Sequence, residues 1–186
     1  MMLARPLVFL AIALALAGCS GYKRPPSAFH EILTQPYRLD SSDRLRVIVF
    51  GQPDLSNTYV VDQAGYISMP LVGNVAARGK TQQELAGAIA ASLRKGFLRD
   101  PDVSVEVEQY RPIFVMGEVQ ASGQYPYVAG MTVQNAIATA GGFSPRAEQA
   151  GADITRQING EILNGRVPIT DPVRPGDTIY IRERLF

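Results

Sequence analysis

The side chains best suited to chemistry are scarce in this chain of 186 residues. It contains one cysteine, Cys19, one histidine, His30, and no tryptophan. A single thiol forms no internal disulfide, and one cysteine with one histidine supplies neither a cysteine-rich metal cage nor a multi-histidine zinc site. The charges nearly cancel, with 18 Lys and Arg against 17 Asp and Glu, whereas a nucleic-acid binder normally needs a basic stripe. We therefore expect no metal, no cofactor and no nucleic-acid partner.

Acid–base chemistry has one candidate pair, Asp54 and Asp62, which could act as the two carboxylates of a glycan hydrolase. Each lies close to a glycine or proline, Gly65 or Pro53, and acids in that setting usually form turns. The sequence has no G-x-S-x-G, H-E-x-x-H, Walker or C-x-x-C pattern. The double glycine at 141–142 follows an expected helix, whereas a phosphate-binding loop should precede one, so it is not a phosphate-binding candidate. We predict no catalytic residue and a protein that is not an enzyme; the hydrolase is the enzymatic alternative.

The thiol of Cys19 has a distinctive context. It follows Leu-Ala-Gly at 16–18, and an unbroken apolar run of 11 residues at 7–17 follows a short start that carries Arg5. This length fits the apolar region of a signal peptide and is too short to span a bilayer. The pattern resembles a bacterial lipobox, at which a thiol is diacylated before the signal is removed. We predict that residues 1–18 are a lipoprotein signal peptide, the alternatives being an ordinary signal peptide or an N-terminal anchor.

Cleavage before Cys19 removes 18 residues and leaves 168, with 17 basic and 17 acidic side chains. Two or three acyl chains such as palmitate, each contributing about 0.8 kcal/mol per buried methylene, would hold this neutral body on a membrane. Ser20 replaces the aspartate typical of inner-membrane retention, so we expect a lipid anchor in the outer membrane and a chain that faces the periplasm. The proline-rich stretch 19–36 reads as an extended tether, in which His30 is solvated.

The residues after the tether predict two small domains, 37–110 and 111–186. In the first, Thr81 and Glu84 form a capping box ahead of a helical apolar pattern that Gly96 would end. Runs of β-branched residues and period-two alternation predict the strands. The expected strands are 45–50, a hairpin of 58–61 and 66–69 closed by the loop 62–65, and 103–107.

The second expected domain contains more strand than helix. A short helix begins at the Thr132 cap and stops at Gly141, and Asn-Gly at 159–160 is a strong two-residue hairpin signal. Further strands are expected at 113–116 and 178–181. Four or five short strands around one helix suggest a β-grasp. The predicted fold class is α+β, a small mixed α/β domain followed by one β-grasp domain.

The order of these features resembles the outer-membrane polysaccharide export family. The resemblance identifies 37–110 with its polysaccharide export domain and 111–186 with a soluble-ligand-binding β-grasp (SLBB) domain. The matching structural positions are Asp43, Asp62, Gly65, Pro70, Gly73, Gly117, Gly123, Gly141, Gly142, Arg156, Pro175, Gly176 and Asp177. The glycines are expected to serve backbone geometry, and Arg156 and Asp177 to be interface or turn residues or a structural salt bridge.

Three departures from the family pattern affect what can be carried over. Ser42 and Ala64 stand where the family usually has Gly and Asp, and both are tolerable if the local turns persist. The third is at the end of the chain, where Phe186 lies five residues after Ile181. A spanning helix needs about 20 residues. We therefore expect the fold and the pathway of the family, without a self-made pore in the outer membrane.

The resemblance implies a non-enzymatic lipoprotein subunit of a translocon that exports capsule or exopolysaccharide. Its subunits would form a homo-oligomeric ring whose lumen conducts the polysaccharide polymer. The implied partners are an inner-membrane polysaccharide co-polymerase and an outer-membrane β-barrel. The alternative is a periplasmic glycan- or ligand-binding lipoprotein that forms no conduit.

Overall fold

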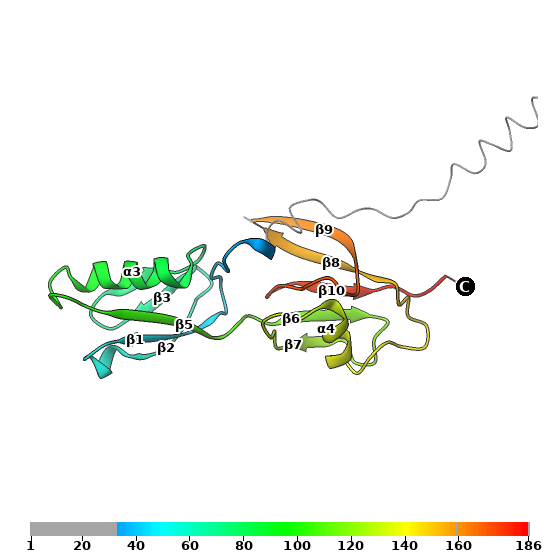
Figure 1. Cartoon of the computed structure of the whole chain (residues 1–186), viewed down its shortest axis with the longest axis horizontal. Coiled ribbons are helices and arrows are strands. Elements are labelled where there is room, and N and C mark those ends of the chain that lie inside the picture. The colour runs from blue at the N-terminus through cyan, green and yellow to red at the C-terminus, as the bar shows by residue number, and fades with distance from the viewer. Residues whose placement is uncertain (1–32, 159, 186) are drawn as a thin grey trace, which may run out of the picture.

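A computed structural model describes residues 33–158 and 160–185, so the predicted signal peptide, Cys19 and His30 lie outside the described residues. The described chain forms two lobes placed end to end (Figure 1). Each lobe has its own cluster of buried apolar side chains, one drawn from residues 39–105 and the other from 113–181. Within the described ranges, no helix is both long and apolar enough to cross a membrane.

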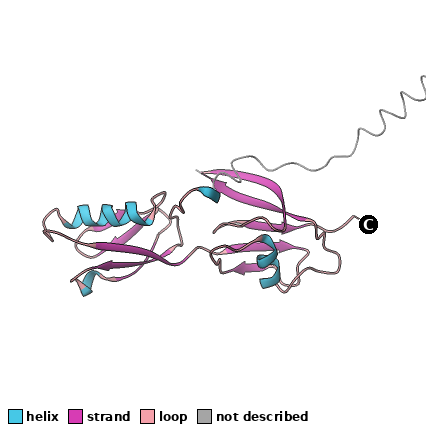
Figure 2. Ribbon diagram, in the orientation of Figure 1, coloured by secondary structure: helices cyan, strands magenta, loops and turns pink. Residues whose placement is uncertain are grey.

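The first lobe packs one helix against small antiparallel sheets, as Figure 2 shows. Strand β1 lies between β2 and β5, and β3 pairs with β4 in a separate two-stranded sheet. These elements are β1 (Arg44–Val49), η1 (Pro53–Leu55), β2 (Asn57–Val60), β3 (Tyr66–Met69), β4 (Gly73–Ala76), α3 (Gln82–Leu93) and β5 (Val103–Gln109).

Sequence periodicity explains how this lobe is packed. Leu45, Val47 and Val49 alternate along β1 and are buried, as period two requires of a strand with one covered face. The capping box at Thr81 and Glu84 is confirmed, with both reciprocal hydrogen bonds formed. Helix α3 ends at Leu93, a few residues before the predicted stop at Gly96.

The predicted hairpin of 58–61 and 66–69 is wrong. Its turn exists, because the Asp62 amide donates to Tyr66 O at 2.9 Å and the Gly65 amide donates to Asp62 O at 3.0 Å. The two strands then diverge: β2 pairs with β1, and β3 pairs with β4. Leu71 and Gly73 adopt positive φ in the turn between β3 and β4. That tight turn brings β4 onto β3, and β1 offers β2 a longer apolar partner than β3 does.

Ser42 is a non-glycine residue at φ 74°, in the turn where the family pattern has glycine. We expect Ser42→Gly to raise the free energy of unfolding by about 0.5–1 kcal/mol, because the relief of left-handed strain exceeds the added entropy of the unfolded chain. Denaturant titration measures the change. The control is Ser68→Gly in the ordinary strand β3, which should lose about 0.5–1 kcal/mol; a loss at both positions would contradict the expectation.

The second lobe is a five-stranded mixed sheet with the order β7-β6-β10-β8-β9. The central strands β6 and β10 run parallel, and the other pairs are antiparallel. This is the β-grasp arrangement, so the predicted α+β fold with a β-grasp second domain is confirmed. The elements are β6 (Ile113–Gly117), β7 (Gly123–Tyr125), α4 (Val133–Thr139), β8 (Gly151–Ile158), β9 (Glu161–Pro168) and β10 (Thr178–Ile181).

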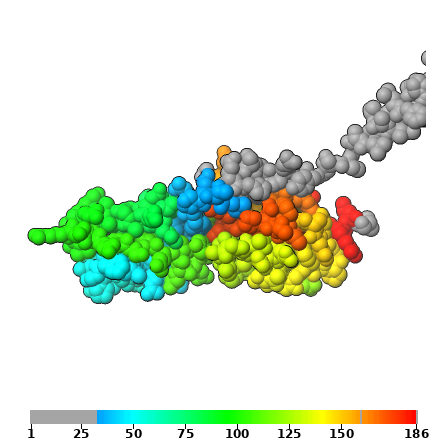
Figure 3. Space-filling view, viewed as in Figure 1, coloured from blue at the N-terminus to red at the C-terminus, as the bar shows by residue number. Residues whose placement is uncertain are grey.

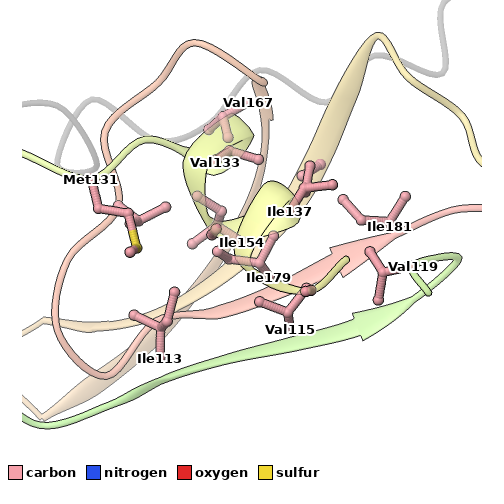
Figure 4. Packing of buried hydrophobic residues seen from close by; sticks show 14 of the residues in the cluster. Ile113, Val115, Val119, Met131, Val133, Ile137, Ile154, Val167, Ile179 and Ile181 are labelled. Carbon is pink, nitrogen blue, oxygen red and sulfur yellow. The ribbon is translucent and has the colours of Figure 1, made fainter. Parts of the chain in front are cut away.

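The core of this lobe lies between α4 and one face of the sheet (Figure 4). Val133 and Ile137 of α4 pack with Val115, Ile154 and Ile179 from three strands. The predicted helix start is confirmed, since the Thr132 hydroxyl accepts the Asn135 amide. The predicted hairpin is confirmed as well, because β8 and β9 pair with Ile158 opposite Glu161.

Candidate functional site

A cleft of about 630 Å³ lies where the two lobes meet. Its walls are residues 35–41 and 78–79 from the first lobe, Arg111 from the connection, and residues 156–158 and 174–177 from the second lobe, with Gly160. Figure 3 shows the chain from residue 33 onward, in blue, at the waist between the lobes. The two domains therefore share this site.

Asp43 is the buried anchor behind the cleft. Its side chain is fully buried, directly after the strained Ser42 turn. The carboxylate accepts the Tyr37 hydroxyl at 2.7 Å, the Asp40 amide at 2.8 Å and the Arg111 amide at 2.9 Å. The last of these bonds crosses 68 positions of sequence, so Asp43 ties the start of the first domain to the connection between the domains.

Arg111 is the cation of this junction. Its Nη1 donates to the Tyr37 hydroxyl at 3.0 Å and lies 3.6 Å from Asp40 and 3.8 Å from Asp43. Burial raises the pKa of Asp43, while the donated amides, the Tyr37 hydroxyl and the charge of Arg111 oppose the rise. Burial also raises the pKa of Tyr37, so this hydroxyl stays protonated and donates to Asp43.

Three tyrosines continue the junction from one lobe into the other. Tyr110 lies edge-on to Tyr37, with ring centroids 5.0 Å apart, and edge-on to Tyr127 of the second lobe, at 5.4 Å. Such T-shaped pairs contribute about 0.5–1.5 kcal/mol each beyond their burial. The aromatic row and the Asp43 network together fix one lobe against the other.

Arg156 and Asp177 form the buried ion pair of the second lobe. Their side chains are 3% and 1% exposed, and two bonds of 2.6 and 2.9 Å join the guanidinium to the carboxylate. Asp177 also accepts the Arg174 amide at 2.7 Å, which closes the turn that enters β10. A Cβ on Gly176, at φ 85°, would lie 2.5 Å from Arg111 Nε, so this turn rests directly on the Arg111 side chain.

Pro175 and Gly176 line the cleft with Arg156 and Asp177, and the other predicted positions do not line it. Asp62 accepts the Tyr66 amide at 2.8 Å in its turn, and Gly65 packs against the Cβ of Arg78. Asp54 lies in η1. The remaining positions are in turns or at strand and helix ends, namely Pro70 and Gly73 between β3 and β4, Gly117 and Gly123 in β6 and β7, and Gly141 and Gly142 after α4.

Two of these glycines are required by close approach. A Cβ on Gly117, at φ 85°, would overlap the carbonyl oxygen of Ile181, which accepts the Glu118 amide. Gly141 adopts φ 83° after α4, where a Cβ would lie 3.0 Å from the Gln120 Cβ. Both glycines allow neighbouring segments of the second lobe to approach closely, and neither lines the cleft.

Sequence reasoning did not single out several residues of the junction: Asp40, Arg78, Tyr110, Arg111, Tyr127 and Arg174. One sequence signal could have indicated Tyr110 and Arg111. The dipeptide Tyr-Arg occurs at 37–38 and at 110–111, the two ends of the first domain. Among the described residues, no group of three or more His, Cys, Asp or Glu side chains could hold a metal ion.

Two family models match the chain in the order of its lobes. The model described as "Polysaccharide biosynthesis/export protein" matches residues 32–108, and the model described as "SLBB domain" matches residues 112–167. The first covers the lobe that contains β1 to β5, and the second covers β6 to β9. The chain therefore contains both domains that the sequence resemblance implied.

Curated relatives carry matching names. The chain is 42% identical over 119 residues to "Exopolysaccharide production protein ExoF" of Rhizobium meliloti. This match covers 58% of this chain and 28% of the relative. It is 27% identical over 183 residues to "EPS I polysaccharide export outer membrane protein EpsA" of Ralstonia nicotianae, covering 80% and 48%.

A third relative is "Polysialic acid transport protein KpsD" of Escherichia coli, 24% identical over 159 residues, with 80% of this chain and 28% of the relative covered. The matches thus span less than half the length of these relatives. With a polysaccharide export domain and an SLBB domain in sequence, the chain belongs to the family of polysaccharide export proteins.

Proposed function

We propose that this chain is a subunit of the translocon that exports capsule or exopolysaccharide across the cell envelope. It is anchored by lipid in the outer membrane, faces the periplasm and forms part of the conduit without catalysis. The observation that carries the proposal is the ordered pair of domains, an export domain at 32–108 and an SLBB domain at 112–167. The name of EpsA, a polysaccharide export outer membrane protein matched over 80% of this chain, supports a role in polysaccharide export and a location at the outer membrane.

The junction suits a role as a building block. Asp43, Arg111 and the three tyrosines fix the two domains relative to each other, so each subunit can present the same surfaces to its neighbours. A closed ring is built from one head-to-tail interface that is repeated between neighbouring subunits. The conduit then works by geometry, because many weak polar contacts guide the polymer and no bond is made or broken.

The proposed assembly has further partners. A homo-oligomeric ring would receive the polymer from an inner-membrane polysaccharide co-polymerase and pass it to an outer-membrane β-barrel. These partners follow from the family resemblance. The printed names of the relatives support export in general and specify no partner.

Deletion of the gene tests the function. We expect surface polysaccharide to fall strongly and polymer to accumulate in the cytoplasm or periplasm, and we expect the intact gene on a plasmid to restore export. A strain that carries Asp54→Asn and Asp62→Asn is the control for the hydrolase alternative, and its export should equal that of the intact protein. Undiminished surface polymer without internal accumulation would overturn the transport assignment.

The anchor is tested at Cys19. We expect Cys19→Ser to abolish palmitate labelling and to release the protein from the membrane, because the serine hydroxyl does not replace the thiol in diacylation. Metabolic labelling with radioactive palmitate and membrane fractionation measure both effects. The control is Ser20→Ala, which keeps the thiol and should label normally. A Cys19→Ser variant that still incorporates palmitate would refute the lipid anchor.

A second candidate function is favoured by one observation, the cleft itself. A volume of about 630 Å³ falls within the range of small-ligand sites, about 300–1,000 Å³. A periplasmic lipoprotein that holds a glycan without forming a conduit would need such a site. The two candidates differ in assembly, since the conduit requires a ring and the binding protein does not.

A further inference from the structure

We infer that the cleft between the two domains binds an acidic polysaccharide through the carboxylates of its sugar units. This inference rests on the proposed function, because it names the class of polymer that the export protein contacts and the place of contact. The ligand is defined by its chemistry, a chain of hydroxylated rings that carries carboxylate groups. The charge, exposure and hydrogen-bonding groups of the cleft support this choice.

The cleft is lined by more cations than anions. Five arginines contribute to its walls, Arg38, Arg78, Arg111, Arg156 and Arg174, against the two carboxylates of Asp40 and Asp177. Two further carboxylates that do not line the cleft pair with these arginines, the exposed Glu84 with Arg38 and the buried Asp43 with Arg111. The lining itself therefore carries more guanidinium groups than carboxylates.

The first-domain wall offers guanidinium groups that a ligand can reach. The side chains of Arg38 and Arg78 are 54% and 49% exposed. Arg78 is oriented across the cleft rim by Asp40, at 2.9 Å, and by the Gln63 carbonyl, at 2.7 Å. Arg78 Nη2 donates to the Ser41 hydroxyl as well, so Arg78 offers a ligand its Nη1. The contacts of Arg38 with Gly79 O and Glu84 use Nη1. The Nε and Nη2 edge of Arg38 therefore suits a carboxylate, which a guanidinium binds through two parallel hydrogen bonds.

The second-domain wall contributes Arg156, Arg174 and Asp177 to the cleft. Arg174 is half-buried there, and its pKa is lowered by burial and by the neighbouring charge of Arg156, although Asp177 opposes the shift. Asp177 is already engaged by two bonds from Arg156 and by the Arg174 amide. The Arg174 guanidinium thus brings a positive charge to this wall, next to the buried Arg156–Asp177 pair.

The remaining lining suits sugar hydroxyl groups. Gln35, Ser41 and Gln157 are polar residues of the lining, and Tyr37 is its aromatic residue. Alternating donors and acceptors with a partly apolar wall provide the contacts that hydroxylated rings use in a ligand site. An acidic peptide would satisfy the arginines equally well but would leave these amide and hydroxyl groups without hydroxyl partners.

The test measures binding of hexagalacturonate, a six-unit acidic oligosaccharide, to the purified lipoprotein in detergent by isothermal titration calorimetry. Maltohexaose, a neutral oligosaccharide of the same length, and a hexaglutamate peptide are the comparison ligands. We expect hexagalacturonate to bind at least tenfold more tightly than either. Arg38→Gln and Arg174→Gln should each weaken its binding about tenfold, the equivalent of one charge-assisted hydrogen bond.

Arg38→Lys and Arg174→Lys should each keep part of the affinity that the glutamine variants lose, because lysine keeps the positive charge but not the two-nitrogen edge of the guanidinium. Melting temperatures verify that each variant is folded. The matched control is Arg99→Gln, an exposed arginine in the loop after α3 at the far tip of the first domain, which should bind as the intact protein does.

Equal affinity for maltohexaose or hexaglutamate, or unchanged binding in both glutamine variants, would overturn the inference. The outcome is separable from that of the proposed function. If deletion of the gene abolishes export while the folded glutamine variants bind hexagalacturonate normally, only the cleft assignment fails. If surface polymer survives the deletion, the export role fails whatever the cleft binds.

Discussion

Replacing Asp177 with alanine is expected to lower the free energy of unfolding of the second domain by about 3–5 kcal/mol. The Arg156 side chain is only 3% exposed, so the variant leaves a buried guanidinium without its carboxylate. The turn at 174–177 also loses the acceptor of the Arg174 amide. Urea titration followed by circular dichroism measures the loss, and a domain of this size is expected to approach unfolding at 37 °C.

The double variant Arg156→Met with Asp177→Leu separates the cost of an unpaired charge from the value of the pair. Replacing both partners by apolar groups of similar volume is often close to neutral, so the double variant should recover at least half of the loss. This comparison depends on the coupling between two residues in direct contact, which is where additivity fails.

The control is an exposed pair of the same domain, Arg146 with Glu183, whose side chains are 69% and 52% exposed. Glu183→Ala should change the stability by less than about 1 kcal/mol, because solvent screens such pairs. A loss of similar size in Asp177→Ala and Glu183→Ala would show that burial does not set the importance of the Arg156–Asp177 pair.

Asp43→Ala is expected to cost about 2–4 kcal/mol and to loosen the two domains from each other. The substitution leaves the Asp40 and Arg111 amides and the Tyr37 hydroxyl without their acceptor. A fully buried donor that stays unsatisfied costs about 1–3 kcal/mol. These three bonds are only part-buried, so water offsets part of the loss and the expected total is smaller than the sum. Because one of these bonds reaches the connection between the domains, the loss concerns their arrangement as well as the stability of the first domain.

Two measurements distinguish these effects. Denaturant titration gives the loss in stability, and small-angle X-ray scattering of the folded variant should show a larger maximum dimension. The control is Asp54→Ala, an exposed aspartate of η1 in the same domain, for which we expect no change in dimension and less than about 0.5 kcal/mol in stability. An Asp43→Ala protein with the dimensions and stability of the wild type would contradict the anchoring role.

The same carboxylate gives a pH dependence. Burial raises the pKa of Asp43 above its ordinary value of 3.8, so the folded state binds a proton more readily than the unfolded state. The wild type therefore gains stability relative to Asp43→Asn as the pH falls through the raised pKa, and loses this gain as the pH rises. Denaturant titrations of both proteins between pH 3.5 and about pH 7 should show that the free energy of unfolding of the wild type minus that of Asp43→Asn increases toward acid pH. A difference that decreases toward acid pH would contradict a raised pKa of Asp43.

Local sequence signals predicted most of the fold. Capping at Thr81 and Thr132, alternation along β1 and the hairpin between β8 and β9 all depend on neighbours within a few residues. The hairpin at 58–69 failed because the turn at Asp62 was correct but its strands found other partners. Strand pairing across sheets depends on long-range packing, which the spacing of residues alone does not encode.

The candidate site was predicted less well, for a related reason. Arg156 and Asp177 matched family positions, and a structural salt bridge was one of the roles expected for them. The folded chain shows that they pair with each other across 21 residues. Arg111 is only the first residue of the second predicted domain, and its role comes from contacts with Tyr37 and Asp43 about 70 positions earlier. A cleft between domains is assembled from such distant residues, so its charge cannot be read from any one segment.

Native mass spectrometry of the lipoprotein extracted in detergent tests the conduit most directly. Fixed domains that pack side by side predict one closed homo-oligomer, with a mass that is a single integer multiple of the lipidated subunit, and no smaller species at working concentration. A monomer that carries bound sugar would contradict the conduit and favour the ligand-binding lipoprotein.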